Sequence, residues 1–297
     1  MSQPNPYEAD PQKIPPTDPY RDEPLYGRYH PHPTDFTPDS QHVNSTTPAS
    51  IAYWASVLTR CTPENRIYEN ETGGRDVFAL GTVIIKSTHL KEEAGRDYTL
   101  ADKNEVAATK LAKPILDQLG IMVPEIYFAG EIQGRSVLVQ QRIPGVGLNV
   151  AWRYLSGSEK HSFKEQARGV LAALEAVKAS DHSQQPDGCP GYIVADPDPV
   201  ANRGIQELER EILLGDGARY PRSLCALTHN DLSQSNLIVD QGKIVAVVDW
   251  EMAGWFGRDA AEAVHLRVRS PSKETYAHLN LPQDVLDDIY FWNDLYA

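Results

Sequence analysis

Residues 227–250 read LTHNDLSQSNLIVDQGKIVAVVDW, and this stretch limits the possible folds of the chain more than any other segment. Asp231 and Asn236 precede a short β-branched run, and Asp249 follows a second one. The two runs meet at Gln241-Gly242, where glycine accepts the positive φ of a tight turn, so they predict a β-hairpin. Because a hairpin returns the chain beside its start, we expect the three polar side chains to face one site.

Oxygen-bearing side chains in this arrangement are typical of phosphoryl-transfer sites. Such sites use an Asp to accept the proton of the attacking hydroxyl, and an Asn and a second Asp to hold magnesium. The pattern therefore predicts Asp231 as the catalytic base, with Asn236 and Asp249 as the ligands of Mg²⁺, which prefers hard oxygen donors. A surface turn with solvated acids would explain any one of these residues, but not the joint pattern. His229 is expected to shape the loop rather than to carry a proton.

The string of His229, Asp231 and Asn236, followed by VVDWEMAGW, resembles the aminoglycoside phosphotransferase and choline kinase-like family, in particular its fungal-type members. The resemblance covers residues 50–297. It implies an α+β, two-lobed protein-kinase-like fold, in which a small antiparallel β-sheet lobe adjoins a larger, mainly helical lobe. It also implies transfer of the γ-phosphate of ATP to a hydroxyl of a small-molecule acceptor. The sequence departs from the family at Asn230, where Gly is usual.

The region before the hinge resembles a nucleotide-binding lobe. Short β-prone runs occupy Arg66–Glu69, Asp76–Leu80 and Thr82–Lys86. Lys86 ends VIIK, as the phosphate-binding lysine of kinases ends VAIK. Glu105 opens a helix-prone stretch, and in kinases a Glu on such a helix pairs with the strand lysine. The alternative is a capping box, in which Glu105 caps the start of its own helix at Asp102.

Two glycines between the first two of these strands are further candidates for ATP binding. Gly73 and Gly74 lack a Cβ, so their backbone amides can approach the ATP phosphates. No GxGxxG or Walker motif is present, and a plain turn is the alternative. Pro114, farther along, is expected to end or kink the helix that carries Glu105.

A hinge between the lobes is expected near residue 143. Two strand-like runs, Ile126–Ala129 and Ser136–Arg142, form a second hairpin, and the following Pro144 breaks the strand pattern. In the resembled family, backbone groups of the hinge bind the adenine edge. The resemblance therefore assigns Gln141 and Ile143 to cofactor binding.

The chain divides into three parts. Residues 1–49 hold half of the 22 prolines and show no helical or strand period, which predicts a disordered tail. An ATP-binding lobe with its hinge is expected over 50–143, beginning with a helix capped by Thr47. A helical lobe with the catalytic and metal loops is expected over 144–297, including a long loop that spans 180–202 and holds Asp181, Asp187, Asp196 and Asp198.

Composition narrows the partners and the location. The net charge is −13, which argues against a nucleic-acid partner because neutralising phosphates requires clustered Lys and Arg. The acidity favours a cationic acceptor, although solubility explains it more simply. No apolar run approaches the ~20 residues of a membrane span, and the start lacks a secretory signal, so we expect no membrane partner and a cytoplasmic location. The three Cys residues show no metal-binding spacing, which fits a reducing compartment.

The short segment after Asp249 leaves little room for the peptide-binding platform of a protein kinase. The sequence therefore predicts a small-molecule kinase that uses ATP and Mg²⁺. A nucleotide-binding pseudokinase or regulatory module with little or no turnover is the alternative, and Asn230 and the weak glycine motif favour it. No motif identifies the acceptor or the oligomeric state.

Overall fold

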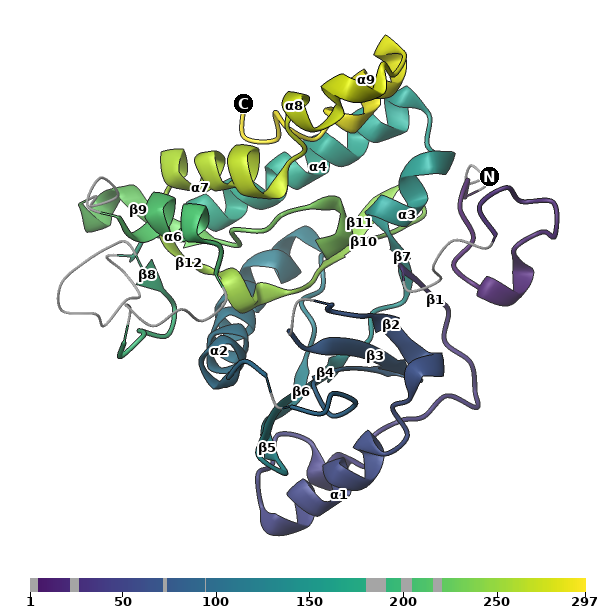
Figure 1. Cartoon of the computed structure of the whole chain (residues 1–297), viewed down its shortest axis with the longest axis vertical. Helices are drawn as coiled ribbons and strands as arrows, with labels where there is room; N and C mark the ends of the chain where they lie inside the picture. Colours follow the sequence, from purple (N-terminus) through teal and green to yellow (C-terminus); the bar gives the residue numbers. More distant parts are fainter. Residues whose placement is uncertain are drawn as a thin grey trace.

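The computed structural model describes residues 5–21, 27–71, 74–93, 95–179, 191–198, 205–215 and 221–297. The chain has an α+β, two-lobed, protein-kinase-like fold, in which a small lobe built on an antiparallel sheet adjoins a larger, mainly helical lobe (Figure 1). Gly73 lies outside the described residues, as do Asp181, Asp187 and Cys189. Among the described helices, none combines the length and the apolar character that crossing a membrane would require.

The small lobe contains a five-stranded antiparallel sheet in the order β2-β3-β4-β6-β5. Its strands are β2 (Arg66–Tyr68), β3 (Asp76–Leu80), β4 (Val83–Ser87), β5 (Ile126–Ile132) and β6 (Arg135–Gln141). These bounds confirm the predicted strands to within a few residues. Helix α1 (Pro48–Leu58) is capped by the Thr47 side chain, which accepts from the Ser50 N–H. It packs Trp54 against Phe78 and Phe128 in the core of this lobe.

Helix α2 (Thr99–Leu116) lies between the small sheet and the large lobe (Figure 1). It starts at Thr99, well before Glu105, so the alternative of a capping box at Asp102 is wrong. Of the two predicted effects of Pro114, an end or a kink of the helix, the first is wrong, because the helix continues to Leu116. Pro114 and Lys110, whose carbonyl would accept the missing N–H, are both exposed, so water can satisfy that carbonyl.

The large lobe carries two small sheets and most of the helices (Figure 1). One sheet has the order β1-β7-β10-β11, and the other has the order β8-β12-β9. The strands are β1 (Arg28–Tyr29), β7 (Gly145–Gly147), β8 (Gly191–Tyr192), β9 (Cys225–Thr228), β10 (Leu237–Asp240), β11 (Lys243–Val247) and β12 (Gly254–Gly257). The helices are α3 (Leu148–Ala151), α4 (Gly157–Glu175), α6 (Glu207–Leu214), α7 (Arg258–Val264), α8 (Lys273–Tyr276) and α9 (Gln283–Ile289).

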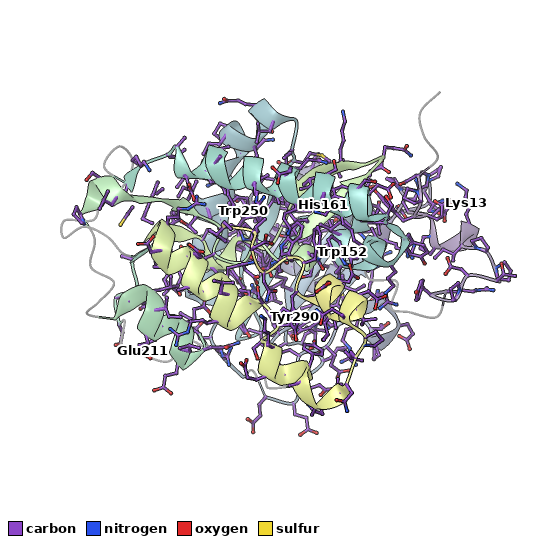
Figure 2. The ribbon with its side chains drawn as sticks, turned by 90° about the horizontal axis from the view of Figure 1, so that it is seen from above. Lys13, Trp152, His161, Glu211, Trp250 and Tyr290 are labelled. Atoms are coloured by element: carbon purple, nitrogen blue, oxygen red, sulfur yellow. The ribbon has the colours of Figure 1, made fainter. Side chains whose placement is uncertain are left out.

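The core of the large lobe forms around the long helix α4. Its apolar stripe, including Phe163, Val170 and Leu174, packs on the strands that carry the 227–250 segment. Near the C-terminus, Trp152 stacks edge-on against Trp292 at 5.8 Å between ring centroids. Trp152 and His161 both lie beside the C-terminal helices, as Figure 2 shows. This packing fixes the strands that position the candidate site.

The prediction of a disordered tail over residues 1–49 is wrong for the described residues of that segment. Tyr7 is 2% exposed and belongs to the core of the large lobe. Arg28 and Tyr29 form β1, which pairs with β7 in antiparallel register. The low average hydrophobicity of the segment concealed these few aromatic anchors, which bury enough apolar surface to order the extended chain between the prolines.

Candidate active site

The 227–250 segment forms the predicted hairpin. Strands β10 and β11 pair in antiparallel register, and the turn residues Gln241 and Gly242 have φ of 48° and 75°. Leu237 faces Val247 across the hairpin, and the Val248 N–H donates to the Asn236 carbonyl at 3.0 Å. The hairpin therefore brings Asn236 and the residues before Asp249 together at one end.

His229 holds the loop before this hairpin in place. The Asp231 N–H donates to His229 Nδ1 at 3.3 Å, so the ring proton sits on Nε2, which donates to the Val248 carbonyl at 3.0 Å. The ring is completely buried, and burial lowers the pKa of His229 to about 4. The neutral ring thus ties the Asp231 backbone to the strand that leads to Asp249, as the sequence predicted.

Burial of this neutral histidine predicts a loss of stability in acid. In the unfolded chain His229 has the ordinary histidine pKa of about 6.5, whereas in the folded protein its pKa is about 4. Between these two pH values the unfolded chain binds a proton at His229 and the folded protein does not. Stability from this group is thus complete above pH 6.5 and falls by up to about 3 kcal/mol on the way to pH 4. Urea denaturation at a series of pH values measures it, with His229→Asn as the control that lacks the titration. Parallel pH profiles for the two proteins would contradict the assignment.

Asp231 lies beside a cation that the sequence did not reveal. Its carboxylate Oδ1 is 3.7 Å from Arg269 Nε, and Arg269 Nη2 donates to Glu209 Oε1 at 2.6 Å. Burial raises the pKa of Asp231, and the positive charge of Arg269 opposes that rise. The Asp231 side chain remains 23% exposed. A partly exposed carboxylate held by a neighbouring cation can accept a proton from a bound hydroxyl.

Asn230 occupies the position where the resembled family usually has Gly. Its φ is 68°, in the left-handed region, which Asn tolerates better than most residues. The side chain is 3% exposed, and neither its Oδ1 nor its Nδ2 has a hydrogen-bond partner among the described residues. Asn230 therefore adopts a backbone conformation that Gly reaches freely, with its side chain buried and unpaired.

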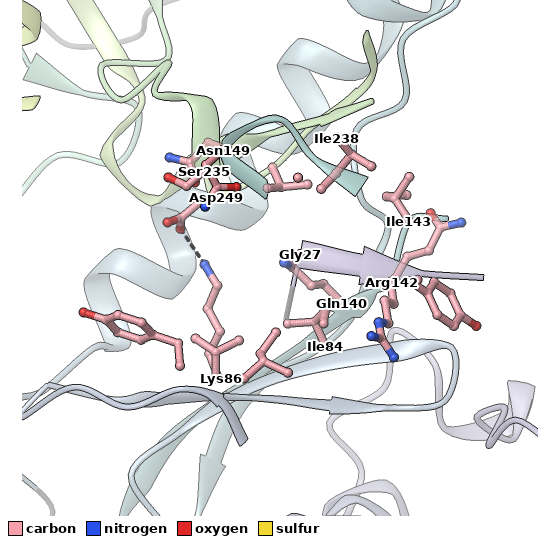
Figure 3. A pocket seen from close by; sticks show the side chains of 18 of the residues that line it. Gly27, Ile84, Lys86, Gln140, Arg142, Ile143, Asn149, Ser235, Ile238 and Asp249 are labelled. Atoms are coloured by element: carbon pink, nitrogen blue, oxygen red, sulfur yellow. Dashed lines mark hydrogen bonds and ion pairs between the residues drawn. The ribbon is translucent and has the colours of Figure 1, made fainter. Parts of the chain in front are cut away.

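Lys86 joins the small lobe to the segment that follows the hairpin. Its Nζ lies 2.8 Å from Glu105 Oε2 and 2.7 Å from Asp249 Oδ1, the second contact being the dashed line in Figure 3. The predicted pairing of Lys86 with Glu105 is thus confirmed. Burial opposes the charge of Lys86, but the carboxylates of Asp249 and Glu105 more than offset it and raise its pKa. Burial opposes the negative charge of Glu105 and raises the pKa of that carboxyl, and the positive charge of Lys86 opposes the rise.

Arg75 and Glu251 extend this cluster, and sequence reasoning assigned no role to Arg75. Arg75 is 5% exposed, its guanidinium pairs with Asp102, and its Nη2 lies 2.7 Å from Glu251 Oε2. Asn104 Nδ2 donates to the carbonyl of Glu251 at 2.8 Å, so α2 also holds the backbone after Asp249. The only sequence signal for these contacts was the position of Glu251, two residues beyond the predicted metal ligand.

A cavity of about 520 Å³ lies between the lobes, and five of the candidate residues line it, namely Lys86, Gln141, Ile143, Asn236 and Asp249 (Figure 3). Asp231 and Glu105 are absent from its described wall, although Glu105 reaches the site through Lys86 and Asp231 through Asn236. One end is charged, with Lys86, Arg75, Asp249 and Glu251 in its wall, together with Asn236. The other end is lined by the hinge and by apolar or glycine residues, namely Gln140, Gln141, Ile143, Ile84, Gly145, Gly147 and Gly27. Arg28, Tyr29 and Arg142 also line the cavity, and Arg142 contacts the Arg28 carbonyl and the Tyr29 ring beside the hinge. The cavity thus has one end where acidic and basic side chains meet and another end formed by the hinge.

Gly74, predicted to approach the ATP phosphates, does not line the described wall of the cavity. Its N–H donates to Asn70 Oδ1 at 3.0 Å. A Cβ at Gly74 would collide with the Asn70 side chain. Gly74 therefore serves close packing of the β2–β3 loop, and its amide is already used, which argues against a contact with phosphate.

The donors at the charged end fit a magnesium ion. Asn236 Nδ2 donates to the Asp231 carbonyl at 2.9 Å, which leaves the amide oxygen as the free end of that side chain. The Asp249 side chain is 37% exposed and lies in the wall of the same cavity. Carboxylate and amide oxygens with access to water and phosphate are the donors that Mg²⁺ prefers.

Comparison with known proteins places the chain among the phosphotransferases. The sequence model described as the phosphotransferase enzyme family matches residues 96–256, which is more than half of the chain. No curated protein matches the chain significantly.

Similar solved structures include the apoenzyme of macrolide 2'-phosphotransferase MphH from Brachybacterium faecium, with 17% identity over 82% of this chain and 90% of that chain, and a TM-score of 0.44. They also include the streptomycin–ATP–APH(2")-IIa ternary complex, with 16% identity over 84% of this chain and 90% of that chain, and a TM-score of 0.45.

Proposed function

The chain belongs to the phosphotransferase enzyme family, and on this premise we propose that it transfers the γ-phosphate of ATP to a hydroxyl of a small-molecule acceptor. The observation that carries the proposal is the convergence of Lys86, Asn236 and Asp249 on the charged end of one cavity. The opposite end is formed by the hinge, by apolar and glycine residues and by the Tyr29–Arg142 pair, which supports a place for a nucleoside. The two ends together support a nucleoside triphosphate as the ligand.

Each residue in the proposed reaction has a role that follows from its contacts. Lys86, held by Glu105, binds oxygens of the α- and β-phosphates. Asn236 and Asp249 hold Mg²⁺, which when bound neutralises charge on the phosphates. Asp231 accepts the proton of the acceptor hydroxyl, and His229 fixes the backbone that orients it.

A second cavity, of about 170 Å³, supports a place for the acceptor. Asn70, Tyr98 and Glu251 line both this cavity and the larger one, so the two adjoin at the charged end. Asp196 and Glu251 contribute carboxylates to the smaller cavity and Arg96 contributes a guanidinium. We propose that a small acceptor enters there, and the net charge of −13 favours a cationic one.

The second candidate function is a nucleotide-binding module with little turnover. The buried, unpartnered side chain of Asn230, one residue before the proposed base, favours it. A buried polar group without a partner at this position costs free energy that a Gly would not. The two candidates differ in turnover and agree on nucleotide binding.

A thermal-shift titration with ATP in the presence of Mg²⁺ tests both candidates. Binding to the folded state at ~100 times Kd stabilises it by about 2.7 kcal/mol, so we expect a clear rise in Tm. Lys86→Met, which removes the phosphate-binding cation, is the control and should show a much smaller rise. Phosphotransfer across a panel of amino alcohols and other alcohols then separates the two: turnover supports the kinase, and binding without turnover supports the module. No rise in Tm would reject both.

A further inference from the structure

A segment before the region that matches the family crosses the hinge between the lobes. Residues 27–36, here called the strap, begin with β1, where Arg28 faces Val146 and Tyr29 faces Gly145 of β7. The strap ends on the small lobe, where the Thr82 N–H donates to the Phe36 carbonyl at 2.9 Å. It therefore bonds to the backbone on both sides of the hinge.

The hinge residue Arg142 clamps the strap. Its Nη2 donates to the Arg28 carbonyl at 3.1 Å, and its guanidinium lies 4.1 Å from the centroid of the Tyr29 ring. The Tyr29 hydroxyl donates to Asp35 Oδ2 at 2.9 Å, within the strap. Arg28 Nη2 donates to the Tyr154 hydroxyl of the large lobe at 3.0 Å. These contacts fix the strap against the hinge and against both lobes.

The first residues of the strap form part of the wall of the larger cavity. Gly27, Arg28 and Tyr29 all line it, and Figure 3 shows β1 running across the end that Gln140 and Ile143 also line. A Cβ added to Gly27 would lie 2.5 Å from Val150 Cγ2, so the close approach of the strap requires glycine. The strap thus meets the cavity at its hinge end, away from Lys86.

The same end contains a polar atom without a partner. Gln140 is 4% exposed and lines the cavity, and its Oε1 has no hydrogen-bond partner among the described residues. A buried carbonyl oxygen of this kind costs free energy until a donor reaches it. A heteroaromatic base carries such donors on its edge and presents flat faces to backbone and apolar walls, whereas a phosphate has neither feature.

We propose that the strap completes the subsite for the base of the nucleotide, with the Gly27–Tyr29 backbone as one wall and the Tyr29–Arg142 contact as the clamp that holds this wall in place. The inference rests on the proposed use of a nucleoside triphosphate. It predicts that the strap controls affinity for the nucleoside part of the ligand and leaves the phosphate end unaffected.

Calorimetric titration of the full chain with three ligands tests this division. Tyr29→Ala removes the ring beneath Arg142, and we expect it to weaken binding of ATP and of adenosine by about tenfold or more, the loss typical of a buried aromatic contact. Binding of tripolyphosphate with Mg²⁺ should stay within about twofold of wild type. Tyr29→Phe, which keeps the ring, should restore most of the affinity. Tyr276→Ala is the matched control, because Tyr276 packs on Tyr290 of the large lobe and is absent from the cavity wall.

The outcomes separate the strap from the proposed function. If wild type binds neither ATP nor tripolyphosphate, the proposed function fails. If wild type binds ATP and Tyr29→Ala binds it equally well, or if the variant loses tripolyphosphate to the same extent as ATP, the strap inference is overturned. Should Tyr29→Ala not fold, hydrogen exchange of the wild-type amides in residues 27–36 replaces it: adenosine should slow their exchange and tripolyphosphate should not. Equal exchange with and without adenosine would overturn the inference.

Discussion

Replacing Asp231 by Asn is expected to lower phosphotransfer by about 10²- to 10⁴-fold while ATP still binds. The substitution removes the group that accepts the hydroxyl proton and keeps the size of the side chain. The hydrogen bonds that hold the loop involve the Asp231 backbone and not its side chain: the Asp231 N–H donates to His229 Nδ1, and the Asp231 carbonyl accepts from Asn236 Nδ2. The loop and the magnesium donor at Asn236 should therefore keep their positions, and the loss should appear in kcat.

Two measurements check this prediction. Calorimetry of ATP binding with Mg²⁺ should give the same Kd for wild type and Asp231→Asn. Single-turnover phosphotransfer to an active acceptor should be slow in the variant and fast in wild type. Asp259→Asn makes the same chemical change at an exposed position at the start of α7 and serves as the control. Equal phosphotransfer by Asp231→Asn and wild type would remove Asp231 from the role of base.

The parts of the fold that the sequence predicted are those encoded by neighbouring residues. The β10–β11 hairpin follows from two β-branched runs and the Gln241-Gly242 turn, all within one short stretch. The same holds for the start of α1 at Thr47, whose side chain caps the helix. The pairing of Lys86 with Glu105 joins two such local patterns, a strand end and a helix face. Local preference and final structure agree at these positions, so short patterns suffice.

The contacts that the sequence did not predict join residues far apart in the chain. Arg75 meets Glu251, and Arg269 lies between Asp231 and Glu209, and neither arginine stands in a pattern that indicates its partner. A single charged residue has no periodicity, and only the folded chain shows whether it is solvated or paired. The strap is a related case, because Tyr29 is held by its pairing with β7 and by the Arg142 side chain, both distant in sequence. These long-range contacts order a segment whose composition is typical of disorder.

Replacing Asp249 is expected to remove the dependence of ATP binding on magnesium. Asp249 supplies the carboxylate that faces the cavity at the charged end, and its backbone has φ of 65°. Asn tolerates this left-handed conformation better than Ala does, so Asp249→Asn tests the charge and Asp249→Ala tests the whole donor. Loss of a charged partner in a partly buried site typically costs 2–5 kcal/mol, so we expect Mg²⁺–ATP to bind about 30-fold more weakly or worse.

Affinity for ATP without Mg²⁺ should not fall in these variants. The Asp249 carboxylate repels the phosphates and shares Lys86 Nζ with Glu105, so removing it leaves the lysine free to bind phosphate. Titration of each variant with ATP at increasing Mg²⁺ measures both effects: wild type should bind more tightly as Mg²⁺ rises, and the variants should respond little. Asp259→Asn should follow wild type. A variant that kept the full response to Mg²⁺ would exclude Asp249 as a ligand and leave Asn236 as the remaining predicted donor, whereas a variant that lost ATP binding with and without Mg²⁺ would show that Asp249 positions Lys86 instead.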